Sequence, residues 1–199
     1  MRETKDIQSE LSEENFEIFL EGTFFNTGGD VSFDDGEPRV LGTPTEAAIL
    51  SFGLGVGGNF KESCERAKLL KMEPFNSKRK VMGVVVKEKE SGKIRAHWKG
   101  ASEIVLERCD KYVNEDGKVV DMDDNKMKEL KDCIHTFADG ALRTLCLAFK
   151  DVDSEPKCDE PIPDDGFVLL AVVGIKDPVR PGVKEAVELC FKAGIKVTD

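Results

Sequence analysis

Hydrophobic side chains recur every three or four residues over residues 12–24 and 124–138. This spacing places them on one face of an α-helix and predicts two amphipathic helices, and a strong helix start predicts a further helix between them, over residues 43–52. The first begins behind Ser12, with Asn15 three residues later instead of the Glu of a full capping box. The second begins at Thr43-Pro44-Thr45-Glu46, where an N-cap, a first-turn proline and a capping-box carboxylate stand in order.

Apolar and β-branched residues dominate five stretches bounded by turn residues, a pattern typical of strands. The second and third of these stretches are joined by Ser91-Gly92, which predicts an antiparallel pair. The predicted strands are residues 68–75, 80–87, 93–99, 142–149 and 167–175.

Two connecting segments have their own patterns. Residues 101–109 predict a short helix. Residues 26–38 are rich in Gly and Asp, and we expect a mobile, exposed loop there with neither regular structure. Together, these elements predict an α+β fold, a twisted antiparallel β-sheet flanked by helices.

The pattern changes after Ile175. Asp177-Pro178-Val179-Arg180-Pro181 is followed by a helical pattern over residues 183–191 and the apolar segment Ile195 to Val197. A strand, a helix and the start of a strand resemble one βαβ step of a parallel sheet. We therefore expect one domain over residues 1–170 and the beginning of a second, truncated one over residues 171–199.

Composition restricts the class of protein. The chain has 199 residues, 40% of them hydrophobic and 7% aromatic, in the range of a soluble globular domain. Its formal charge of -10 and pI near 4.9 argue against binding to nucleic acid or to anionic membranes. No stretch is apolar enough to cross a bilayer, and the start lacks the core of a signal peptide, so we expect a soluble chain that is not secreted.

The potential metal ligands are scattered. The six cysteines form no C-x-x-C pair, and His97 and His135 are the only histidines. The spacing favours reduced cytosolic thiols and no metal site.

Lys99-Gly100-Ala101-Ser102-Glu103 is the first candidate for binding chemistry. It joins a predicted strand to a predicted helix, where Gly lets a ligand approach the backbone and Lys99 supplies a charge for phosphate. Taken alone, the same sequence is more often only a turn.

Four further motifs accompany this one along the chain. In order, the five are Gly42-Thr43-Pro44-Thr45-Glu46, Glu73-Pro74-Phe75-Asn76-Ser77-Lys78-Arg79-Lys80, Lys99-Gly100-Ala101-Ser102-Glu103-Ile104-Val105-Leu106, Ala141-Leu142-Arg143-Thr144-Leu145 and Val173-Gly174-Ile175-Lys176-Asp177-Pro178-Val179-Arg180-Pro181-Gly182-Val183. This series resembles the nucleotide-binding (N) domain of P-type ATPases, and its sequence is most similar to that of calmodulin-regulated (type IIB) calcium pumps of the plant autoinhibited kind. The resemblance covers nearly the whole chain from about residue 10.

The resemblance implies an ATP site with a role for each matching residue. Phe75 would stack on the adenine ring, and Lys80 and Lys99 match the two pocket lysines. Lys99 would lie deepest, beside Gly100 and Ala101, where no bulky side chain blocks the base. Without the neighbouring lysine, Phe75 would be read as a core residue at a strand end. Lys80, from the sequence alone, is also consistent with a solvated charge on a strand.

Three further positions carry over. Glu46 matches the acidic residue at the adenine and ribose end, although a capping box explains it equally well. Arg143 matches the arginine that reaches the phosphates, although an isolated Arg before a strand is more often a surface ion-pair residue. Many animal calcium pumps have a phosphate-binding arginine at the position of Ser77, so either Lys78 or Arg79 would replace that charge or the affinity for the nucleotide would be lower.

Asp177 and Arg180 match the hinge and phosphorylation-domain motif, which faces the phosphates when the domains close. Their alternative is the N-terminus of a helix. Residues 194–199 resemble the approach to the Met-Val-Thr-Gly-Asp loop but lack several of its residues. We therefore expect a truncated or altered end and assign Thr198 and Asp199 no magnesium role.

The implied function is that of the cytosolic ATP-binding domain of a calcium pump. The sequence contains neither Asp-Lys-Thr-Gly-Thr, whose aspartate receives the phosphoryl group, nor a membrane helix, so we expect no catalytic and no metal-binding residue within it. ATP, with Mg²⁺ in the whole pump, is the implied cofactor. The implied partners are the pump's own P and A domains and calmodulin, which would bind outside this chain. The implied location is the cytosolic face of a plasma membrane or endomembrane.

Two other classes of protein fit the residues. One is a stand-alone nucleotide-binding or regulatory module that never catalyses. The other is an interaction domain whose basic motifs are surface charges. A nucleotide titration distinguishes the interaction domain, which would bind no ATP, from the pump domain and the stand-alone module.

Overall fold

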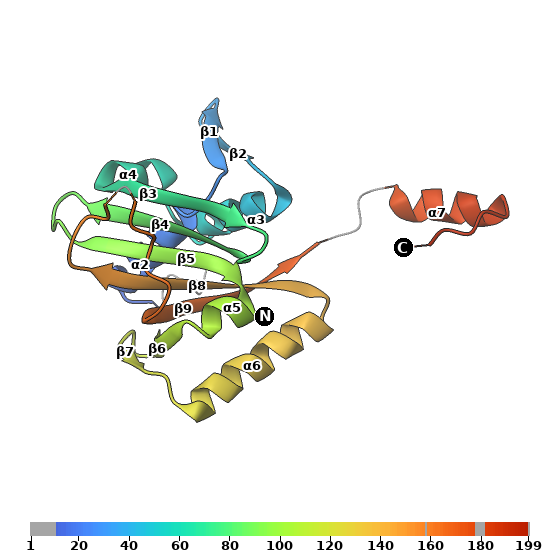
Figure 1. The fold of residues 1–199 in the computed structure, drawn as a ribbon. Coiled ribbons are helices and arrows are strands. Elements are labelled where there is room, and N and C mark those ends of the chain that lie inside the picture. The colour runs from blue at the N-terminus through green and yellow to red at the C-terminus, as the bar shows by residue number, and fades with distance from the viewer. Residues whose placement is uncertain (1–10, 158, 178–181, 199) are drawn as a thin grey trace.

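The computed structural model describes residues 11–157, 159–177 and 182–198, and its main feature is a seven-stranded sheet (Figure 1). The strand order is β3-β4-β5-β8-β9-β6-β7. Every neighbouring pair is antiparallel except β6 and β9, which are parallel. The strands are β3 (Ala67–Asn76), β4 (Val81–Glu88), β5 (Ile94–Ala101), β6 (Cys109–Val113), β7 (Val119–Asp121), β8 (Leu142–Val152) and β9 (Phe167–Lys176).

Helices cover both faces of this sheet. The α+β prediction is therefore confirmed. The helices are α2 (Glu13–Phe24), α3 (Pro44–Gly55), α4 (Phe60–Arg66), α5 (Ser102–Leu106), α6 (Asp124–Asp139) and α7 (Val183–Lys192).

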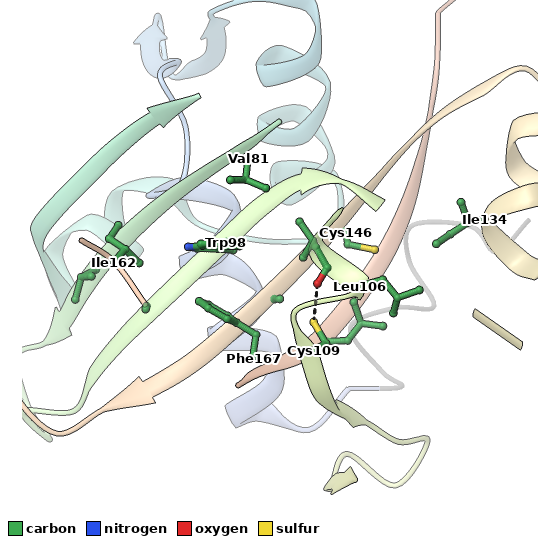
Figure 2. Close-up of a cluster of buried hydrophobic side chains, with 13 residues drawn as sticks. Val81, Trp98, Leu106, Cys109, Ile134, Cys146, Ile162 and Phe167 are labelled. Atoms are coloured by element: carbon green, nitrogen blue, oxygen red, sulfur yellow. Dashed lines mark hydrogen bonds between the residues drawn. The ribbon is translucent and has the colours of Figure 1, made fainter. Parts of the chain in front are cut away.

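Alternation along β8 divides the core into two layers. Leu147 packs in a cluster with Phe19 of α2 and Leu50 of α3. Its neighbours Cys146 and Ala148 pack in a second cluster, shown in Figure 2, which also holds residues of α5 and α6. We refer to the two sides as the α3 face and the α6 face of the sheet.

The α6 face carries the larger aromatic core. Trp98 and Phe167 lie with ring centroids 5.0 Å apart, and Phe167 has no exposed surface. Cys109 donates through Sγ to the Val105 carbonyl at 3.2 Å, which ties the start of β6 to α5 (Figure 2). The thiols of Cys64, Cys109, Cys133, Cys146 and Cys190 are free, and the remaining cysteine lies outside the described residues.

The helix starts follow from local sequence. Ser12 Oγ accepts from Asn15 N–H, as the N-cap prediction requires. Thr43 and Glu46 form the complete capping box, with Pro44 at the first helical position. All five predicted strands are confirmed to within a few residues of their predicted ends.

The prediction of an irregular loop over residues 26–38 was wrong. β1 (Asp30–Asp34) and β2 (Glu37–Leu41) form an antiparallel hairpin instead. Its two-residue connection is Asp35-Gly36, with φ of 49° and 86°. Two consecutive positive φ angles are what a tight hairpin turn needs, and Asp-Gly is a strong sequence signal for it.

Other differences are smaller. α4, β6 and β7 were not predicted, and the helix expected over residues 101–109 ends at Leu106, so that Cys109 begins β6. The expected strand start at residues 195–197 is not formed. α7 lies apart from the sheet in Figure 1, and none of its described residues is buried.

Candidate functional site

A cavity of about 300 Å³ opens on the α3 face of the sheet. It lies where the N-terminus of α3, the end of β3, and the adjoining ends of β4, β5 and β8 meet. Its lining contains Glu46, Phe75, Lys99, Gly100 and Arg143 of the predicted ATP site, together with Thr43, Thr45, Met82 and Leu145.

Lys99 stands at the inner wall of this cavity. It lies on β5, paired in register with Met82 on β4 and Leu147 on β8, and is only 6% exposed. Its Nζ has no hydrogen-bond partner among the described residues. Burial lowers the pKa of the Lys99 ammonium to about 8, against a smaller opposing effect of Glu46. A buried, unpartnered ammonium calls for an acceptor that a ligand can supply.

Glu46 is held by three backbone and side-chain donors. Its Oε1 accepts from Gly28 N–H at 2.8 Å, and its Oε2 accepts from Thr43 N–H at 3.0 Å and from Thr43 Oγ1 at 2.7 Å. Burial would raise the pKa of this carboxyl, but these hydrogen bonds and the charge of Lys99 lower it overall. The capping role and a place in the cavity therefore coexist, as the two interpretations allowed.

Phe75 projects from the end of β3 and is 61% exposed. This exposure excludes the alternative that Phe75 is a core residue. The pairing of β3 with β4 is irregular between Glu73 and Asn76, so Phe75 lies in a bulge at the cavity mouth. An exposed aromatic face beside a buried ammonium suits a planar ring that also offers acceptors.

Arg143 borders two cavities. Its Nη1 donates to Thr45 Oγ1 at 2.9 Å, and both residues line the first cavity and a neighbouring one, also of about 300 Å³, that includes Asp177. No ion pair of Arg143 is found among the described residues, contrary to the surface ion-pair alternative. Arg180, the other predicted hinge residue, lies outside the described residues.

Three predicted site residues do not line the cavity: Ser77, Lys80 and Ala101. Ser77 and Lys80 are exposed in the turn after β3. Lys80 adopts φ 56°, and its carbonyl accepts from Ala101 N–H at 3.0 Å. A Cβ at position 100 would lie 2.4 Å from that carbonyl, so Gly100 is needed for the close approach of the two chains.

Sequence reasoning missed Met82, Leu145 and the role of Thr45. Strand alternation contains part of the signal, because Met82 and Leu145 face the same side of the sheet as Lys99. The Thr45 contact joins residues 98 positions apart, and only the folded chain reveals it.

The described part of the chain contains no group of three or more His, Cys, Asp or Glu side chains that could hold a metal ion. Among the same residues, no helix is both long and apolar enough to cross a membrane.

Residues 18–182 match the sequence profile of the family described as P-type ATPase, cytoplasmic domain N. The chain is 52% identical over 195 residues to putative calcium-transporting ATPase 7, plasma membrane-type, of Arabidopsis thaliana, covering 98% of this chain and 19% of that protein. It is also 52% identical over 192 residues (96% of this chain, 19% of that protein) to calcium-transporting ATPase 2, plasma membrane-type, of the same plant. Calcium-transporting ATPase 10, plasma membrane-type, of Oryza sativa subsp. japonica is 49% identical over 197 residues, which cover 98% of this chain and 19% of the rice protein.

Proposed function

Because the chain belongs to the family of P-type ATPase cytoplasmic N domains, we propose that it binds ATP in the cavity between Phe75, Lys99 and Arg143. The observation that carries this proposal is the Lys99 ammonium, which is buried in the cavity wall without a hydrogen-bond partner among the described residues. Such a group is costly to the empty domain, and an acceptor on a bound ligand offsets that cost.

Four of the lining residues have a direct role in this proposal. Phe75 offers its exposed face to the adenine ring, and Lys99 donates to an acceptor of the nucleoside or its phosphates. Glu46, which its hydrogen-bond donors keep ionised, lines the same cavity as Lys99. The guanidinium of Arg143 donates to Thr45, and its other N–H groups, which have no side-chain hydrogen bond within the described part of the chain, can bind phosphate oxygens.

Three predicted residues have indirect roles in the same proposal. Lys80 and Ala101 form the backbone contact that Gly100 permits, and Ser77 lies on the adjoining turn. In the absence of a described metal-ligand cluster, Mg²⁺ would arrive on the phosphates of ATP.

The wider activity is part of the proposal, since the chain spans about 19% of the length of the curated relatives it matches. We propose that the domain presents ATP to a phosphorylatable aspartate of a calcium-transporting ATPase, on the cytosolic face of a plasma membrane or endomembrane. Its partners would be the P and A domains of the same pump, with calmodulin acting outside this chain. Residues 1–170 would form the N domain, and residues 171–199 would be the hinge and the start of the P domain.

A nucleotide titration of the purified chain tests the proposal. We expect ATP binding that needs little Mg²⁺, measured by calorimetry or by NMR. Phe75→Ala should weaken it about tenfold, since stacking of a base on an aromatic ring contributes roughly 1–3 kcal/mol. Lys128→Met, a change on the exposed side of α6, is the matched control. No binding by the parent chain at millimolar ATP would refute the proposed function.

A further inference from the structure

Glu73 on β3 joins two segments that follow it in sequence. Its Oε1 accepts from the Ile162 N–H at 2.8 Å, and its Oε2 accepts from Arg79 Nη1 at 3.0 Å. The Glu73 side chain is 24% exposed, so both bonds are partly shielded from water. Neither contact belongs to the sheet or to the cavity, and Glu73 is not a lining residue of the proposed ATP site.

The two partners of Glu73 differ in how firmly they are fixed. Ile162, in the segment between β8 and β9, is 1% exposed and belongs to the buried cluster around Trp98 (Figure 2). It packs against β4, because a Cβ at Gly83 would lie 3.2 Å from Ile162 Cδ1 and 3.0 Å from the Trp98 ring. Arg79 sits in the exposed turn, with its guanidinium carbon 5.5 Å from the Trp98 ring centroid. Glu73 therefore fastens a surface turn to an anchored side chain.

This fastening lies on the face of the sheet opposite the cavity. Glu73 is in register with Gly83, and Gly83 with Trp98, on the α6 face. Met82 and Lys99, one residue away on β4 and β5, line the cavity on the α3 face.

The bulge in β3 puts the side chain of Phe75 on the face of the sheet opposite to that of Glu73, although strict alternation would put both on one face. Glu73 pairs with Gly83 and Asn76 with Val81, so β3 uses one more residue than β4 over this stretch. An extra residue of this kind re-aims the side chains that follow it. Beyond the bulge, Asn76 Oδ1 accepts from the N–H groups of Lys78 and Arg79 at 2.9 and 3.1 Å. Phe75 thus sits between two held points, Glu73 before it and the turn after it.

We propose that Glu73 is a positioning residue of the nucleotide site, which aims Phe75 into the cavity by clamping the bulge between Ile162 and Arg79. This inference rests on the proposed function for its consequence in ATP affinity. The clamp itself is a property of the ligand-free protein. The negative charge of Glu73 holds Arg79 in an ion pair, and its acceptor oxygen holds the N–H of Ile162 in a hydrogen bond.

Glu73→Gln separates these two contacts, because the amide oxygen still accepts from Ile162 N–H while the Arg79 ion pair is lost. In the ligand-free protein, we expect amide hydrogen exchange of Lys78, Arg79 and Lys80 to quicken by about fivefold or more, with Leu147 on β8 unchanged. We also expect the emission of Trp98, the single tryptophan, to change as Arg79 leaves its ring. Glu90→Gln, in the exposed turn after β4, is the matched control.

The second readout is a double-mutant cycle in ATP affinity. Glu73→Gln should weaken ATP binding by about threefold to tenfold in the parent chain and have almost no effect in the Phe75→Ala background, because the clamp acts through that ring. A role in general stability would give equal effects in both backgrounds and quicker exchange throughout the sheet, and that result would overturn the inference. Unchanged turn exchange in Glu73→Gln would overturn it whether or not ATP binds. A parent chain that binds no ATP refutes the proposed function separately.

Discussion

The buried ammonium of Lys99 is expected to lower the stability of the ligand-free domain while it favours binding of an anionic ligand. Burial lowers the pKa of Lys99 from the ordinary lysine value to about 8. This difference means that folding destabilises the charged form by roughly 3 kcal/mol relative to the neutral form. The opposing attraction of Glu46 is smaller than the effect of burial and does not cancel it. A site that must be ready for an anionic ligand is therefore expected to destabilise the empty domain.

Replacing Lys99 by Met tests this conflict directly. Met fills a similar volume without a charge, so we expect the free energy of unfolding at pH 7 to rise by about 1–2 kcal/mol while ATP affinity falls. Urea unfolding and calorimetric titration of the same preparations measure both. Lys128→Met should change neither. A variant that loses stability together with affinity would contradict the assignment of Lys99 as an unsatisfied ligand group.

The same pKa predicts how ATP affinity depends on pH. Below pH 8 the Lys99 amine is charged and can donate to ATP. Above it the empty site loses that proton, so affinity should fall by up to about tenfold per pH unit between pH 8 and 10. Stability without ATP has the opposite slope, because the unfolded chain holds the proton up to the ordinary lysine pKa and folding becomes more favourable as pH rises through this window. Titrations in Lys99→Met should show neither trend.

At the scale of elements, the link between α6 and β8 contains a strained residue. Ala141 follows the helix cap Gly140 and adopts φ 55°, a left-handed conformation that disfavours any residue with a Cβ. Ala141→Gly should stabilise the fold by about 1 kcal/mol, less the extra entropy of Gly in the unfolded chain. Thermal unfolding measures the gain. Ala138→Gly, inside the same helix, should lower the melting temperature, and a similar loss in Ala141→Gly would show that no strain is stored there.

The elements also show what sequence can and cannot predict. Helix starts with a cap, such as Ser12 and Thr43, and strands with continuous apolar residues were predicted, because their causes are local. The Asp35-Gly36 hairpin had a local signal that was outweighed by its polar composition. The direction of the Phe75 side chain had no local signal in the sequence. It depends on one extra residue in the pairing of β3 with β4 and on the contact of Glu73 with a residue 89 positions away.

The cavity combines both kinds of information. Lys99 and Glu46 were placed by the resemblance, and the fold brings them to one cavity with Phe75, Gly100 and Arg143. Ser77, Lys80 and Ala101 adjoin these residues in sequence but lie outside the lining. Ser77 and Lys80 stand in the exposed turn after β3, whereas Ala101 pairs in register with the lining residue Leu145 and its short side chain does not line the cavity. The order of the motifs thus predicts which segments meet, and the fold decides which of their side chains line the cavity.

At the scale of the whole molecule, the sheet and α7 are distinct in how they are held. Residues 171–176 complete β9 and pair with Leu142–Leu147 on β8, although the proposed hinge begins at residue 171. The described residues of α7 are all at least partly exposed, including Leu189 at 66% and Phe191 at 59%. Apolar side chains left open in this way are typical of a surface that another domain covers.

Two truncations test this division. A chain ending after residue 176 keeps β9 whole, so we expect its melting temperature to stay within about 2 °C of the parent and its ATP affinity within about twofold, since no described residue of α7 is buried. A chain ending after residue 170 loses the half of β9 that pairs with Arg143 and Leu145 of β8, and it keeps only the part of β9 that also pairs with β6. We expect its free energy of unfolding to fall by several kcal/mol, about as much as a large-to-small substitution in a core costs. We also expect it to aggregate through the uncovered edge of β8. Thermal unfolding, nucleotide titration and light scattering of the three chains make the comparison. Equal loss of stability in both truncations would mean that α7 belongs to the folding unit of the sheet and would overturn the division into an N domain and a hinge with the start of a second domain.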